Sequence, residues 1–339
     1  MSKFKVEFRL KQHTPIIHFQ SEQNGATLRA TELKPKFDRF LKEQAFNGEI
    51  PEEFLIAKDK EALDYKVKLI PKNKEVSLPN SSLYFANNAV NNDNEKKHTV
   101  KTISLDIEFF TFNTKLLQKI EKYFNDFLLI TNFGSRSSKG YGSFTCNTDS
   151  VSVVLNKYYP NMVFKISNID NILDWEEKVD NTHKRLKSGI NFRQYHKSLL
   201  FQYMCIKNVR WEKRKIKEQF SELAKGKEPI DCNIKKEYRY IRAMLGLAGI
   251  NEYQGKKIVS ISHKNGTIER FVSPITYKVI DNNIYMLCDK SYENVMNETF
   301  TFKFKGKSFD IKTPSQDEFD LYEFLKFVEK QENLIHEVR

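Results

Sequence analysis

The segment best suited to hold an anion is the glycine-rich stretch at residues 133–144, with sequence FGSRSSKGYGSF. Three of the chain's twelve glycines, Gly134, Gly140 and Gly142, fall within nine residues here. Glycine adopts positive φ and lets another backbone approach closely, and successive backbone amides in such a loop form an anion-binding concavity. Arg136 and Lys139 add positive charge. The segment therefore predicts a phosphate-binding loop, with a basic surface turn as the alternative.

The loop does not match the known nucleotide-binding motifs. Tyr141 follows Gly140, where a Walker motif requires Lys and then Ser or Thr to reach the phosphates and Mg²⁺. The loop also precedes a predicted strand, whereas a dinucleotide fingerprint opens a helix. These differences favour the phosphate backbone of a nucleic acid over a bound nucleotide.

The strands and helices predicted around the loop follow the order of a known fold. Alternating apolar residues predict strands at 4–10, 65–70 and 99–111, and a returning strand at 142–152. Apolar residues at helical spacing predict helices at 26–41, with Thr31 as cap and Pro35 in the first turn, and at 115–129, capped by Asn113-Thr114. The order strand, helix, strand, strand, helix, strand is that of the ferredoxin-like split βαβ unit, expected over residues 1–152.

Residues 153–339 again mix strands and helices. A hairpin is expected at 270–288, an alternating segment at 300–311, and helices at 235–248 and 318–330. The prediction is an α+β fold of two ferredoxin-like, RRM-like units, in which the second carries a helical basic insertion at about 172–250.

The insertion holds most of the chain's excess positive charge. Residues 178–227 contain fourteen Lys or Arg and four Asp or Glu, with Phe192, Tyr195 and Trp211 among them. Cations interleaved with aromatics suit backbone neutralisation and base stacking, although a solvated helix face is the alternative. The candidate RNA-binding residues of this segment are Arg185, Lys187, Arg193, Arg210, Lys213 and Arg214.

Composition restricts the classes of partner. The net charge of +12 favours nucleic acid first and an anionic membrane surface second. No apolar run approaches the roughly 20 residues that span a bilayer. The four cysteines lack C-x-x-C spacing, so we expect free thiols in a reducing cytoplasm, with no metal site and no cofactor.

Two histidines could serve as general bases. His13 and His18 lie beside basic groups, where an imidazole could deprotonate an RNA 2′-hydroxyl. Five positions apart on an extended segment, they face opposite sides, so a packing role is the alternative. Glu32 is expected in an ion pair at a helix end rather than in a metal site.

Four stretches of sequence resemble a known family. The loop F-G-x-R-x-x-x-G-Y-G-S, the strand end Thr14-Pro15-Ile16, the block from Leu28 to Phe40 and the segment from Ser273 to Lys278 resemble the RAMP proteins of CRISPR systems. The arrangement looks most like the first RAMP subunit of the Cmr (type III-B) effector complex. Two departures are Pro35, where that subunit has Gly, and Arg39-Phe40-Leu41-Lys42, where it has a Trp-rich run.

The resemblance implies a non-catalytic RNA-binding subunit in antiviral defence. It would contact guide RNA and target RNA near the 3′ end of the guide, beside other RAMP subunits and with no membrane. Its RNA-facing loop would comprise Gly134, Ser135, Arg136, Ser138, Lys139, Gly140 and Gly142, and its neighbouring basic helix Arg29, Lys34 and Arg39.

Two enzymatic alternatives remain. One is a metal-independent endoribonuclease that processes guide precursors with His13 or His18 as base, although such RAMP nucleases typically carry the glycine loop near the C-terminus. The other is a target-cutting backbone subunit, which needs an Asp in a loop. Asp38 instead falls within a predicted helix, which argues against this reading.

Overall fold

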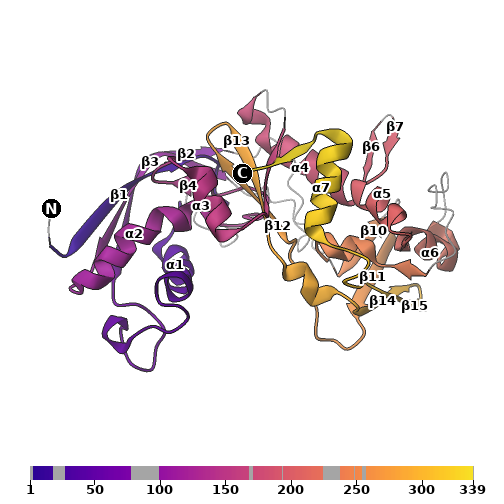
Figure 1. Ribbon diagram of the computed structural model, residues 1–339, viewed down its shortest axis with the longest axis horizontal. Helices are drawn as coiled ribbons and strands as arrows, with labels where there is room; N and C mark the ends of the chain where they lie inside the picture. Colours follow the sequence, from indigo (N-terminus) through magenta and orange to yellow (C-terminus); the bar gives the residue numbers. More distant parts are fainter. Residues whose placement is uncertain are drawn as a thin grey trace.

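The computed structural model describes residues 3–17, 27–77, 99–167, 171–192, 194–223, 237–247, 249–253 and 257–338. The protein is a mixed α+β molecule with several sheets. Figure 1 shows an N-terminal unit on the left and a C-terminal unit on the right, which meet around β12 and β13. No helix among the described residues is long and apolar enough to cross a bilayer.

The N-terminal unit is a four-stranded antiparallel sheet with two helices. Its elements are β1 (Lys5–Gln12), α1 (Ala30–Ala45), β2 (Lys66–Ser77), β3 (Thr99–Phe110), α2 (Thr114–Ile130) and β4 (Phe144–Thr145). The strand order is β2-β3-β1-β4. Both helices lie on one side of the sheet (Figure 1). The element order is the one predicted from the sequence.

The two helices begin differently. α2 starts as expected, because the Asn113 side chain accepts a hydrogen bond from the Leu116 amide. α1 starts at Ala30 with Arg29 as N-cap, so the prediction that Thr31 caps it is wrong and Pro35 lies past the first turn. Thr31 and Pro35 are both exposed. Water can therefore satisfy the carbonyl that Pro35, which lacks an N–H, leaves without a donor.

The C-terminal unit contains a second four-stranded sheet with the same plan. Strands β5 (Val163–Ile166), β12 (Ile275–Ile280), β13 (Asn283–Cys288) and β16 (Ile335–Glu337) lie in the order β12-β13-β5-β16. The helix α4 (Trp175–Lys187) follows the first of these strands, and α7 (Leu321–Glu332) precedes the last. If the strands of each sheet are counted in chain order, both sheets have the second strand at one edge, followed by the third, the first and the fourth.

Long segments between these elements build a third sheet of six strands in the order β10-β11-β14-β15-β9-β8. Its strands are β8 (Arg210–Trp211), β9 (Tyr238–Arg239), β10 (Ile250–Tyr253), β11 (Lys257–His263), β14 (Thr299–Phe304) and β15 (Lys307–Lys312). A small hairpin joins β6 (Ile190–Phe192) and β7 (Gln194–His196). The short helices are α3 (Val151–Tyr158), α5 (Leu199–Ile206), α6 (Glu212–Gln219), η1 (Glu52–Phe54), η2 (Ile172–Asp174), η3 (Ser221–Leu223), η4 (Ile241–Leu245) and η5 (Ser291–Val295).

The insertion is therefore not purely helical as expected. The helix predicted at 235–248 is wrong over its described part, which holds β9 and the 3-10 helix η4. Tyr238 and Arg239 pair with β8, and Arg239 also with β15, so the ladder overrides helix propensity. The returning strand predicted at 142–152 is limited to β4, because α3 already begins at Val151.

One cysteine departs from the expectation of free thiols. Cys146 and Cys288 are free, but Cys205 is disulfide-bonded. The sequence offered no C-x-x-C spacing to indicate this bond, which depends on tertiary proximity.

Candidate nucleic-acid interface

The glycine loop lies where the two units meet. Lys139 forms an isolated parallel bridge with Tyr277 of β12, whose amide donates to the Ser138 carbonyl at 3.0 Å. The Asn132 side-chain amide donates to the carbonyls of Ser137, at 2.7 Å, and Tyr277, at 2.8 Å. On the other side, Tyr141 packs edge-on against Trp175 of α4. The loop is therefore clamped between its own unit and the next.

Two glycines permit this clamping. Gly134 has φ of 76°, and a Cβ there would lie 2.5 Å from the Ile17 carbonyl oxygen. Gly142 has φ of 67°, and a Cβ there would lie 1.9 Å from the Phe133 carbonyl oxygen. Both sites combine positive φ with backbone contact, so only glycine fits without distortion.

Most loop amides bond within the protein. Gly134 donates to Glu32 Oε1 at 2.7 Å, and Ser135 donates to the Ile17 carbonyl at 2.7 Å. Gly140 and Gly142 also donate to backbone carbonyls. Among the described carbonyls, none accepts from the amides of residues 137 and 138. These two amides at the tip of the loop could therefore face an anion.

The first turn of α1 holds the base of the loop. Glu32 Oε1 also accepts from Lys36 Nζ at 2.9 Å, which confirms the expected ion pair at a helix end. Lys36 in turn donates to the Asn132 carbonyl at 3.1 Å. Glu32 and Lys36 therefore position the base of the loop.

Three of the candidate lysines are half-buried: Lys139 in the loop, Lys187 close to it, and Lys213 on α6. Lys139 Nζ is buried and has no hydrogen-bond partner among the described residues. Burial and the neighbouring Lys187 and Arg136 lower the pKa of Lys139 to about 7. Burial and Arg242 lower the pKa of Lys187 to about 8 and that of Lys213 to about 7.

Lys187 and Lys213 are engaged within the C-terminal unit. Lys187 Nζ donates to the Gly246 carbonyl at 2.7 Å, and Lys213 Nζ to the Ser188 carbonyl at 3.2 Å. His183 Nδ1 of α4 lies 3.3 Å from the Tyr277 hydroxyl. Burial and the positive charges of Lys139 and Lys187 lower the pKa of His183 well below its usual value. Lys139 and Lys187 thus place positive charge beside the loop rather than in an exposed stripe.

On α1, the three candidate cations occupy different environments. Arg29 is half-buried at the N-cap. Lys34 Nζ is 2.8 Å from Asp38 Oδ2, donates to the Leu63 carbonyl and lies 3.9 Å from the Tyr65 ring centroid. Arg39 is exposed, with no partner in the described part of the chain. Arg39 is therefore the member of this set that can reach a ligand without breaking an internal contact.

The remaining candidates of the basic segment do not converge on the loop. Arg185 pairs with Glu332 of α7 and donates to the Lys197 carbonyl. Arg210 lies 3.9 Å above the Tyr238 ring centroid, and Arg214 pairs with Glu218 at 3.0 Å. Arg193 lies outside the described residues.

His13 is a structural residue at the joint. The Asp281 amide donates to its Nδ1 at 3.0 Å, so Nε2 carries the proton and donates to Thr145 Oγ1 at 2.8 Å. Burial and the charge of Lys278 lower the pKa of His13 to about 4. Both ring nitrogens are engaged, which supports the packing role over the general-base role. His18 lies outside the described residues.

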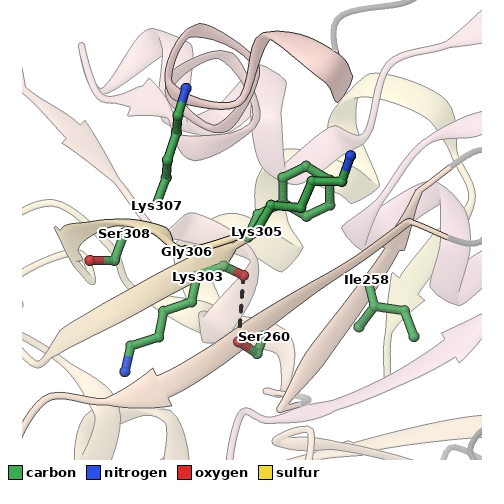
Figure 2. Close-up of a pocket in the computed structure, with 8 residues that line it drawn as sticks. Ile258, Ser260, Lys303, Lys305, Gly306, Lys307 and Ser308 are labelled. Atoms are coloured by element: carbon green, nitrogen blue, oxygen red, sulfur yellow. Dashed lines mark hydrogen bonds between the residues drawn. The ribbon is translucent and has the colours of Figure 1, made fainter.

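A surface hollow of about 470 Å³ lies on the third sheet, at the β14–β15 turn. Figure 2 shows that the side chains of Lys303, Lys305 and Lys307 point in different directions. Lys305 is already paired with Glu222 at 2.5 Å. The hollow does not gather its charges on one point, so it is a weaker candidate than the joint. Within the described ranges there is no metal-binding cluster of His, Cys, Asp and Glu.

Reasoning from the sequence missed the residues that fix the loop from outside it. They are Asn132, Trp175, Tyr277 and Lys278. Lys278 is fully buried, and its Nζ donates to the carbonyls of Thr131, at 2.7 Å, and Phe144, at 3.3 Å. The available signal was the segment from Ser273 to Lys278, which belongs to the family resemblance but had no role assigned to it.

Comparison with known proteins yields two family matches. The model of the Cmr1 N-terminal domain matches residues 3–190, and that of the Cmr1 C-terminal domain matches residues 195–338. No curated protein matches the chain. The crystal structure of Cmr1 from Pyrococcus furiosus in its apo form is similar with a TM-score of 0.46 and 10% identity, covering 99% of this chain and 98% of that one. A cryo-EM structure of the type III-B Cmr-beta bound to cognate target RNA matches with a TM-score of 0.29 and 15% identity, over 43% and 59% of the two chains.

Proposed function

Because the chain belongs to the Cmr1 family, the RAMP family to which its glycine loop pointed, we propose that it is a non-catalytic RNA-binding subunit of a type III-B CRISPR effector. It contacts guide RNA, target RNA or both near the 3′ end of the guide, beside other RAMP subunits in the cytoplasm. Its two ferredoxin-like units span 1–152 and 153–339, with the basic insertion at about 172–250 in the second.

The observation that carries this proposal is the positive joint between the units. Residues 135–139 of the loop are all half-buried, Lys139 Nζ has no hydrogen-bond partner among the described residues, and Lys187 is close enough to lower the pKa of Lys139. These lysines raise the local potential, and Arg136 at the loop tip supplies the contact. Such a site reads backbone charge and shape rather than base sequence.

The test is RNA affinity of the Arg136→Gln, Lys139→Met double variant. Methionine keeps the volume of Lys139 against Tyr277 while removing its charge. We expect affinity to fall by about tenfold, equally for two RNAs of unrelated sequence, because a hydrogen bond to a charged group contributes roughly 1.5–3 kcal/mol. The slope of log affinity against log salt should shrink by about 1, because Arg136 is the cation of the pair that contacts phosphate. Fluorescence anisotropy at several salt concentrations measures both.

The matched control is Lys290→Met, which removes an exposed lysine distant from the loop in sequence. Its affinity should equal that of the wild type. Unchanged RNA affinity in the double variant would rule out the assigned role of the loop.

A further inference from the structure

Among the described residues, no helix covers the outer face of the N-terminal sheet (Figure 1). Along β3, the side chains of Leu105, Ile107 and Phe109 are buried on the side covered by α1 and α2. The alternate residues Asp106, Glu108 and Phe110 point to the other side and are only half-buried. Figure 1 shows both helices on the same side of β1, β2 and β3.

Three phenylalanines, here called the aromatic group, lie at one end of the sheet: Phe110 on the outer face, and Phe4 and Phe112 just beyond the ends of β1 and β3. Phe112 is 75% exposed. Its ring centroid lies 5.0 Å from that of Phe110 and 5.6 Å from that of Phe4, both edge to face. Phe110 belongs to β3, an inner strand of the sheet. Rings on an inner strand of an open four-stranded sheet offer a stacking platform for bases.

Exposed lysines lie along β2, from Lys66 beside the aromatic group to Lys74 near the other end of the strand. Lys66, Lys68 and Lys74 are exposed and have no partner in the described part of the chain. Lys66 lies directly across from Phe110. Residues two apart in a strand are about 6.7 Å apart on one face, a step that one nucleotide of an extended strand can span.

The acidic residues of the face do not neutralise this line. Glu108 pairs with Lys5 at 2.5 Å, and Asp106 pairs with Arg9 at 3.1 Å and Lys72 at 2.6 Å. The carboxylates are therefore occupied by other cations, and the three free lysines leave a net positive strip.

Protection of an edge strand explains only part of this pattern. β2 is an edge of its sheet, and lysines on an edge discourage pairing with another chain. That role concerns the lysines alone and gives no reason for the ring of Phe112, which is 75% exposed and packs against Phe110.

We propose that the outer face of the N-terminal sheet binds a single-stranded RNA segment, whose bases stack on Phe110 and Phe112 and whose backbone follows Lys66 and Lys68. This inference rests on the proposed function and adds a second contact surface to it. The ligand is single-stranded because stacking on side chains requires bases that are free of their own neighbours.

The experiment compares two variants on two probes. Phe112→Ala removes the exposed ring, and Lys66→Gln with Lys68→Gln removes the adjacent charge. The probes are a 15-nucleotide oligouridine and a duplex RNA of the same length. We expect each variant to bind oligouridine about tenfold more weakly, and Phe112→Ala to leave duplex binding unchanged. The controls are Leu173→Ala, an apolar side chain that is 76% exposed, and Lys290→Gln.

Folding is checked by circular dichroism, and Phe112→Leu retains apolar bulk if Phe112→Ala is unstable. Wild-type oligouridine affinity in the sheet variants, with loss in the loop double variant, overturns this inference and leaves the proposed function intact. Wild-type affinity in all of these variants overturns both. If the sheet variants keep RNA affinity but no longer co-purify with neighbouring subunits, the face binds protein and the inference is wrong.

Discussion

The ammonium group of Lys139 lies in an unfavourable place for a charge. Its Nζ is buried without a hydrogen-bond partner among the described residues and lies 5.6 Å from the Tyr277 ring centroid. Burial, Lys187 and Arg136 lower its pKa from 10.5 to about 7. Between these two values the unfolded chain holds a proton that the folded chain has lost, so this lysine makes stability rise with pH. Below about pH 7 Lys139 is charged in both the folded and the unfolded state, so its burial lowers the free energy of unfolding by the full amount.

Lys139→Met should therefore stabilise the protein most at low pH. We expect the variant to exceed the wild type in unfolding free energy by roughly 2 kcal/mol or more at pH 6, and the difference to shrink toward pH 10. Urea unfolding at pH 6, 7.5 and 9 measures it, with Lys290→Met as the control that should show no difference. Parallel pH profiles of Lys139→Met and wild type would show that Lys139 carries no such cost.

At the scale of the element, the glycine loop is a folded connector whose shape depends on close backbone approach. Gly142 donates to the Pro15 carbonyl at 2.8 Å, and its α-carbon faces the Phe133 carbonyl. Gly266 has a similar φ of 73°, but no atom lies within 4 Å of the position that a Cβ would take there. Comparing Gly142 with Gly266 therefore separates the free-energy cost of a side chain at positive φ from the cost of its steric clash with the backbone.

Gly142→Ala should destabilise the protein far more than Gly266→Ala. We expect about 1 kcal/mol for Gly266→Ala, from backbone strain alone, and more than about 4 kcal/mol for Gly142→Ala, because the added methyl meets backbone atoms that cannot move away. Thermal unfolding of both variants gives the comparison. Similar losses in the two would mean that the loop relaxes to accommodate a side chain.

At the scale of the whole molecule, the two units share an apolar interface in addition to the clamped loop. Leu129 of α2 and Leu155 of α3 pack with Val163, Ile280 and Leu287 of the second four-stranded sheet. Lys278 adds hydrogen bonds from β12 to the first unit. The units should therefore unfold together.

Leu155→Ala tests this coupling. Leu155 is fully buried in α3, whereas Val153 of the same helix is 70% exposed. We expect Leu155→Ala to cost about 2–5 kcal/mol and to broaden or split a single calorimetric transition, while Val153→Ala stays close to wild type. A wild type that already unfolds in two separate transitions would contradict the coupling.

The sequence predicts elements whose pattern is local, and it misses contacts between segments that are far apart in the chain. Alternation along 99–111 and helical spacing along 115–129 identified β3 and α2, because each buries one face against a core supplied by neighbouring elements. The glycines of the loop were also identified, since positive φ leaves a local signal. The contact that holds the loop region to β12 was not predicted, because it joins Asn132 to Tyr277, which are 145 positions apart in the sequence. β9 escaped detection for the same reason, as only pairing with β8 and β15 makes it a strand.

The shared strand order has a consequence for synthesis on the ribosome. The first sheet has all of its strands once β4 has emerged, so its core can close early. In the second sheet, β5 pairs with two strands that are synthesised later. Tyr285 of β13 pairs with Lys165, and Ile335 of β16 pairs with Ile166. At roughly 5–20 residues per second, β5 remains without its partners for on the order of ten seconds. During that interval the finished N-terminal unit is the native surface nearest to it along the chain, and α3 links the two directly.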